Sequence, residues 1–218
     1  MILAAMVAFI YSVTDGYRSK QLRFIPYYTM TSLLDGLSGF CVNYIIKDHR
    51  INVLVSKLSA VLFILFLLLE FIFLTNFLLH TIISKRKRRI ARIAAVIFTL
   101  SLVPAFVYNR YYATNSFGIP ILPMESIFLI SLCLLYVYEL FQFPLPGSFR
   151  SRPAFWVVAG IMLYHSCSIP LFLLTSIIRR EFPANEYSAF YSINDILYGI
   201  FFIMLIRACT LVPKESSG

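Results

Sequence analysis

Seven long apolar stretches, separated by short segments rich in charged, glycine or proline residues, dominate the sequence. They are Met1 to Thr14, Phe24 to Ile46, Val53 to Ile83, Ile93 to Tyr108, Met124 to Phe143, Ala154 to Ile178 and Ala189 to Leu205. The runs are continuous rather than alternating, which favours membrane-spanning helices of ~20 residues over the strands of a barrel. We therefore expect an all-α, polytopic transmembrane helical bundle with about seven spans.

The composition excludes an ordinary soluble protein. Apolar residues make up 60% of the chain and charged residues 13%, whereas soluble proteins have about 45–50% and 25%. Seven spans leave only about 70 residues for loops and ends. Because that is too little for a separate catalytic or nucleic-acid-binding domain, we expect residues 1–218 to form a single transmembrane domain.

The first stretch, Met1 to Thr14, is the shortest and would cover only ~21 Å as a helix. It either crosses a thinned bilayer with the help of the next residues or lies as a re-entrant or interfacial segment. If it does not cross, six spans remain and both chain ends lie in the cytoplasm. A cleaved signal peptide is not favoured, because no basic residue precedes the apolar run.

Lysine and arginine are distributed unevenly between the two predicted sides. The segments Asp15 to Arg23, Ser84 to Arg92 and Pro144 to Pro153, with the tail from Arg207, hold 13 of the 19 positive residues. Short cytoplasmic loops carry the excess of positive charge. We therefore predict a multi-pass protein of the inner (plasma) membrane, with the N-terminus outside and the C-terminus inside.

Six positive residues gather directly after the third stretch, in the predicted loop from Ser84 to Arg92. They are Lys85, Arg86, Lys87, Arg88, Arg89 and Arg92. A basic cluster beside a span is typical of contact with anionic lipids at the cytoplasmic face. An acidic membrane or cytoplasmic signalling partner is the alternative. Nucleic acid is not expected, because the cluster lacks interleaved aromatic residues and a supporting domain.

The cysteines and aromatic residues indicate no metal or cofactor site. Four cysteines occur singly within the stretches: Cys41, Cys133, Cys167 and Cys209. Without paired cysteine and histidine motifs, neither a disulfide framework, a metal site nor a cofactor is expected. Tyr27, Tyr28 and Trp156 lie near the ends of stretches, where we predict them to be interfacial anchors.

Polar residues inside the stretches are the candidates for a functional site, because their burial in a membrane is costly. They are Asp35, Glu70, Asn76, His80, Glu125, Glu139, His165, Asn194 and Asp195. Counting ~1.5 Å per residue from the predicted cytoplasmic boundary places Glu70, Glu125 and Asp195 in the outer half of the membrane. The group either lines one polar cavity between the third, fifth, sixth and seventh helices or forms separate hydrogen bonds between helices.

Motifs of several membrane functions are absent from the sequence. The last stretch has no lysine for retinal, and there is no arginine-rich voltage sensor or potassium filter. HExxH and GxSxG motifs are missing too. His165 lies beside Ser166 and Ser168, but without an orienting acid this favours a polar helix contact over a nucleophile. No catalytic residue is predicted.

The C-terminal half carries a loose motif, from Pro123-Met124-Glu125-Ser126 through Ser151-Arg152-Pro153-Ala154-Phe155-Trp156 to Tyr164 and Asn194. It resembles small, largely uncharacterised polytopic bacterial membrane proteins, and is loosely similar to the membrane modules of sensor kinases. The resemblance implies signal sensing, although the chain has no kinase or other output domain.

The expected function is that of a non-enzymatic sensor or partner-binding seven-helix module. A small proton- or cation-coupled transporter or channel, with the acids along its pathway, is the first alternative. A membrane-embedded lipid-modifying enzyme, with His80 or His165 as general base, is a weaker one. The sequence identifies neither the ligand nor the oligomeric state.

Overall fold

The computed structural model describes residues 2–14, 22–40, 49–112, 121–143, 148–181 and 184–212. These residues form seven α-helices and one short 3-10 helix, and contain no strand. The elements are α1 (Ile2–Thr14), α2 (Phe24–Phe40), α3 (His49–Thr81), α4 (Lys85–Tyr112), α5 (Ile121–Gln142), η3 (Phe149–Ser151), α6 (Pro153–Glu181) and α7 (Ala184–Thr210). Each apolar stretch of the sequence overlaps one helix, so the prediction of an all-α helical bundle is confirmed.

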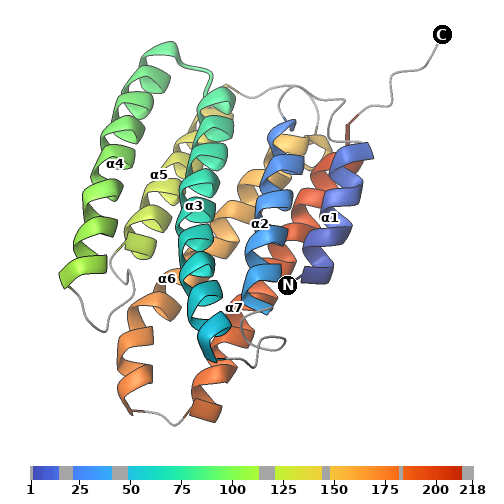
Figure 1. Cartoon of the computed structure of the whole chain (residues 1–218). Helices are drawn as coiled ribbons and strands as arrows, with labels where there is room; N and C mark the ends of the chain where they lie inside the picture. The colour runs from blue at the N-terminus through green and yellow to red at the C-terminus, as the bar shows by residue number, and fades with distance from the viewer. Residues whose placement is uncertain are drawn as a thin grey trace.

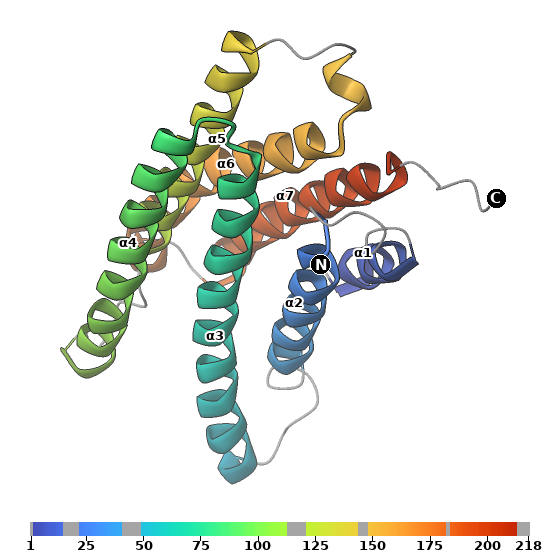
Figure 2. The same ribbon diagram turned by 90° about the horizontal axis from the view of Figure 1, so that it is seen from above.

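Six of these helices close into a ring. α1 packs against α2 and α7, α2 against α3, α3 against α5, α5 against α6, and α6 against α7. α4 lies outside the ring, beside α3 and α5, on the flank opposite α1 (Figure 2). Successive helices alternate in direction, so that α1, α3, α5 and α7 end at the same end of the bundle (Figure 1).

Four of the described helices contain a segment long and apolar enough to cross a membrane. These segments are Val61–Thr81 of α3, Leu122–Gln142 of α5, Pro153–Leu174 of α6 and Ser192–Thr210 of α7. α1 offers only the short apolar segment Ile2–Val13, and α2 has 17 residues. The membrane-type helical bundle is therefore established, whereas seven crossings stay a prediction.

The outer surface of the bundle carries large apolar side chains. On α4, for example, Ile93, Val96, Ile97 and Leu100 lie three or four residues apart and are all more than half exposed. A stripe of this kind is unfavourable in water but matches the hydrocarbon of a bilayer. This surface agrees with a position of the bundle in a membrane.

The basic cluster is helical and is not a loop. α4 begins at Lys85, and only Ile82, Ile83 and Ser84 connect it to α3. The prediction of a loop as far as Arg92 is therefore wrong, because lysine and arginine have high helix propensity and the backbone N–H of Arg88 already donates to the Ser84 carbonyl at 2.9 Å. We call the end of the bundle where α3 ends and α4 begins the basic end.

The predicted orientation rests partly on positive residues that the structure does not describe. Arg18, Lys20 and Lys214 lie outside the described residues. Arg150 lies in η3, Arg152 directly follows it, and Arg207 lies in the last turn of α7. The end of α7 is at the same end of the bundle as the start of α4 (Figure 1).

α6 and α7 pack most extensively of all helix pairs, and Gly160 lies at their contact. A Cβ atom at Gly160 would lie 2.8 Å from Cδ2 of Phe201 and 3.2 Å from Cβ of Met204. Only a hydrogen at this position allows the two helices to approach so closely, as small residues do in membrane helix pairs.

Candidate functional site

A chain of hydrogen bonds links three helices in the centre of the ring. The hydroxyl of Tyr28, on α2, donates to Oε1 of Glu70, on α3, at 3.0 Å. The same hydroxyl lies 2.6 Å from that of Tyr198, on α7. All three side chains are buried. α2 and α7 both pack against α1, so the Tyr28–Tyr198 bond joins two helices that lie on either side of α1.

Aromatic rings surround this chain of hydrogen bonds. The ring of Tyr164, on α6, lies 5.0 Å from that of Tyr198. Phe201 and Phe202 contact both Tyr28 and Tyr198, with centroid distances between 4.9 and 6.2 Å. The carboxyl group of Glu70 thus accepts a hydrogen bond from the Tyr28 hydroxyl, beside a group of aromatic side chains.

A second buried acid, Glu125, lies on α5, which packs against α3. Phe71, next to Glu70, and Phe128, one turn after Glu125, have ring centroids 5.5 Å apart. Oε1 of Glu125 is buried and has no hydrogen-bond partner. The half-buried Asp35 lies two turns after Tyr28 on the same face of α2. Within the described part of the chain, no lysine or arginine pairs with Glu70 or Glu125. We call Tyr28, Glu70, Glu125, Tyr164 and Tyr198 the acid–tyrosine cluster.

A histidine lies between α5 and α6. Nδ1 of His165 is 3.0 Å from Oγ of Ser126, the residue after Glu125. Nε2 of His165 is buried and has no partner. A serine–histidine pair of this kind lacks the acid that orients a catalytic histidine, so among the described residues it is a polar contact between helices.

A further polar contact joins α6 to α7. Oγ of Ser168 donates to Oδ1 of Asn194 at 3.3 Å, and these two residues lie one helical turn from Tyr164 and Tyr198 respectively. Asn194 therefore extends the acid–tyrosine cluster along α7. The neighbouring residue Asp195 is exposed and points to another face of the helix.

The structure brings together some of the sequence candidates and separates others. Asp35, Glu70, Glu125, His165 and Asn194 lie at or beside the acid–tyrosine cluster. Asn76, His80 and Asp195 are exposed, so these three do not belong to the buried group.

Glu139 lies apart from the cluster, at the basic end, where it is 1% exposed. It accepts hydrogen bonds from the backbone N–H groups of Ile83, at 2.6 Å, and Ser84, at 3.4 Å. Nζ of Lys87 lies 3.6 Å from its Oε1. Glu139 thus holds the α3–α4 connection against α5.

The prediction that Tyr28 is an interfacial anchor is wrong. Its side chain is 0% exposed and belongs to the core, whereas an interfacial anchor would be partly exposed. Tyr27 is 51% exposed, as expected of an anchor. A signal for Tyr28 was available: Tyr28, Ser32 and Asp35 lie four and three residues apart and therefore share one face of α2.

No protein-family model, curated protein or solved structure matches the chain. The function must therefore be inferred from the site. Among the described residues there is no group of three or more histidine, cysteine or acidic side chains that could hold a metal ion. No disulfide joins Cys133, Cys167 or Cys209, and Cys41 lies outside the described residues.

The chemistry of the acid–tyrosine cluster favours binding over catalysis. Two buried carboxyl groups without a basic partner attract protons or small cations, and aromatic faces stabilise organic cations. The unpartnered Oε1 of Glu125 and Nε2 of His165 provide further hydrogen-bonding capacity in the same region.

Proposed function

We propose that the protein is a membrane-embedded sensor or partner-binding module, in which a small cationic ligand binds at the acid–tyrosine cluster. In this proposal seven helices cross the inner membrane, with the N-terminus outside and the basic end in the cytoplasm.

The observation that carries the proposal is the hydrogen-bond chain Glu70–Tyr28–Tyr198. It joins α2, α3 and α7 through two phenol hydroxyls at 3.0 and 2.6 Å. A cation that pairs with Glu70 competes with Tyr28 for the carboxylate. A ligand changes a conformational equilibrium only if it binds the two states with different affinity, and loss of this hydrogen bond supplies such a difference.

The basic end is the surface from which the signal is read. Arg86 and Arg89 are exposed on α4, and Glu139 connects the start of this helix to α5. Repacking of α3 against α5 at the cluster would therefore change the position of the basic end. An acidic protein is the partner that these positive charges favour.

Site-specific photo-crosslinking in native membranes tests this role. A photoreactive amino acid at Arg86 or Arg89 is expected to give one discrete protein adduct, whose yield changes at least threefold in Glu70→Gln. The control places the same probe at Ile97, which is exposed on α4 farther from the basic end, and gives no such adduct. If Arg86 and Arg89 give no adduct, or Glu70→Gln leaves its yield unchanged, the proposal is wrong.

A proton- or cation-coupled transporter is the second candidate. It is favoured by Glu70 and Glu125, two buried acids that lack a basic partner among the described residues. Purified protein in liposomes would then show proton or cation uptake under an imposed gradient, and Glu70→Gln and Glu125→Gln would abolish it. Glu139→Gln, outside the cluster, is the matched control. Absence of uptake in the native protein excludes this candidate.

A further inference from the structure

A cavity of about 480 Å³ lies at the basic end. It is lined by the end of α3, the α3–α4 connection, α4, α5 and the first residues of α6. This volume falls within the roughly 300–1,000 Å³ of small-molecule sites. The cavity is separate from the acid–tyrosine cluster, because none of the five cluster residues lines it.

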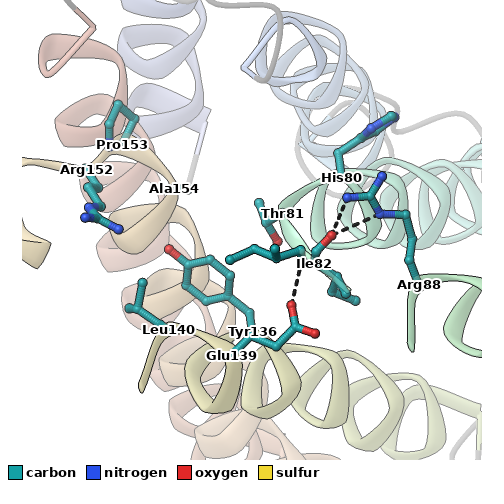
Figure 3. Close-up of a pocket in the computed structure, with 11 residues that line it drawn as sticks. His80, Thr81, Ile82, Arg88, Tyr136, Glu139, Leu140, Arg152, Pro153 and Ala154 are labelled. Carbon is teal, nitrogen blue, oxygen red and sulfur yellow. Dashed lines mark hydrogen bonds between the residues drawn. The ribbon is translucent and has the colours of Figure 1, made fainter. Parts of the chain in front are cut away.

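Two arginines line this cavity on opposite sides (Figure 3). Arg88 lies on α4, and Arg152 is the residue directly before α6. Nε and Nη2 of Arg88 donate to the carbonyl oxygen of Ile82, with Nε at 3.0 Å. A guanidinium group has five N–H donors, so Arg88 retains others for a ligand while its position stays fixed. Tyr136 extends from α5 toward Arg152 and adds a phenol hydroxyl (Figure 3).

The acid in the cavity wall does not cancel these positive charges. The carboxylate of Glu139 accepts the N–H groups of Ile83 and Ser84 and forms an ion pair with Lys87. Its charge is therefore already balanced. Of the charged residues that line the cavity, Arg88 and Arg152 are positive and Glu139 is negative, so the formal charge of the lining is positive.

The surroundings are those of a membrane interface. Nζ of Lys87 lies 4.6 Å from the centroid of the Tyr138 ring, and the guanidinium of Arg207 lies 5.9 Å from that of Trp156. Cationic and aromatic side chains gather in this way at the level of lipid head groups. Basic pockets between membrane helices recognise phosphate-bearing head groups.

We propose that this cavity binds a phosphate group, carried by a phospholipid or free in solution, between Arg88 and Arg152. Arginine is suited to this ligand, because its planar N–H groups bind two phosphate oxygens together. The first residues of α6, Pro153 and Ala154, line the same cavity, so the positive end of that helix dipole adds to the attraction.

The test compares two variants that lose the same charge. Arg88→Gln/Arg152→Gln removes both cavity arginines, and Arg86→Gln/Arg89→Gln removes two exposed arginines of α4 that do not line the cavity. Native mass spectrometry measures the binding of phosphatidylglycerol, with diacylglycerol as the lipid without phosphate. Wild-type protein is expected to retain one phosphatidylglycerol. The cavity variant should raise its Kd at least tenfold, and the control variant less than twofold.

Inorganic phosphate distinguishes the source of the ligand. If it displaces the lipid at millimolar concentration, the cavity accepts free phosphate as well; if it does not, the site is specific for the head group. Arg152→Gln alone retains the hydrogen bonds of Arg88 to Ile82. It is expected to raise the Kd for phosphatidylglycerol at least threefold, and it tests the proposal if the double variant does not fold. Equal losses in the cavity and control variants, or no saturable binding of either ligand, would overturn the proposal.

Discussion

The hydroxyl of Tyr28 lies 3.0 Å from Oε1 of Glu70, although the two residues are 42 positions apart in the chain. The same hydroxyl lies 2.6 Å from that of Tyr198 on α7. One phenol therefore connects an uncompensated acid on α3 to α7. The stability of the bundle and its proposed response to a ligand both depend on this contact.

A double-mutant cycle measures the contact directly. Tyr28→Phe removes the donor and Glu70→Met removes the acceptor, with little change in side-chain volume. We expect a coupling free energy on the order of 1 kcal/mol in the unfolding of the protein in micelles. As a control, Tyr28→Phe is combined with Ser131→Ala, at an exposed position of α5. The changes in the free energy of unfolding of these two substitutions should be additive. Additivity of the first pair would contradict the hydrogen bond.

Gly160→Ala is expected to destabilise the packing of α6 on α7. The added Cβ would lie 2.8 Å from the ring of Phe201, which is fully buried and has no room to move. Overpacking of this kind costs about 1–3 kcal/mol of the free energy of unfolding. Gly199→Ala is the matched control, since its Cβ would have nothing within 4 Å. It should be neutral or slightly stabilising, by up to about 1 kcal/mol. Equal melting temperatures of the two variants would refute the close contact.

Glu139→Gln is expected to loosen the α3–α4 connection. The amide oxygen of glutamine can accept a hydrogen bond from only one of the two backbone N–H groups, because the NH₂ group faces the other. The amide also lacks the negative charge that pairs with Lys87. Trypsin cleavage at Lys85 to Arg89 should become at least several times faster. Ser131→Ala, at an exposed position of the same helix whose hydroxyl bonds to its own backbone, serves as control and should change the rate little. Unchanged cleavage of Glu139→Gln would show that Glu139 does not hold the connection.

Ser126→Ala should destabilise the α5–α6 contact. It leaves Nδ1 of His165 without the partner that lies at 3.0 Å, in a side chain whose Nε2 is already unpartnered. We expect a loss of about 1–3 kcal/mol in the free energy of unfolding. Ser131→Ala, which removes a hydroxyl bonded to its own helix, should cost less than about 0.5 kcal/mol. Similar losses in both variants would argue against the Ser126–His165 bond.

The helices were predictable from the sequence because continuous apolar runs determine them locally. The face of each helix that turns inward depends on its neighbours, and this limited the prediction of the site. Tyr27 and Tyr28 are adjacent and chemically identical, yet one is exposed and the other is buried. Only the packing of α2 between α1 and α3 decides which of them meets Glu70.

Two further differences between the prediction and the structure also arise from contacts between residues that are distant in the sequence. The basic segment was predicted to be a loop, because its charges separate two apolar stretches. The structure instead starts α4 at Lys85, where Glu139, distant in the sequence, pairs with Lys87. His165 was considered with the serines beside it, but it bonds to Ser126, 39 residues earlier. Long-range partners of this kind leave no periodic signal in the sequence.

The proposed sensing role requires the acid–tyrosine cluster and the basic end to be coupled, through the packing of α3 on α5 and also through α7. Trp156, the single tryptophan of the chain, reports on the basic end, because Arg207 of α7 lies over its ring. α7 also carries Tyr198, which bonds to Tyr28.

The decisive measurement is the fluorescence of Trp156 in lipid nanodiscs. Tyr28→Phe and Glu70→Met are each expected to shift its emission maximum or its quenching by iodide, while Ser131→Ala leaves both unchanged. Identical Trp156 emission and quenching in the native protein and both cluster variants would contradict the coupling and the proposed sensing role.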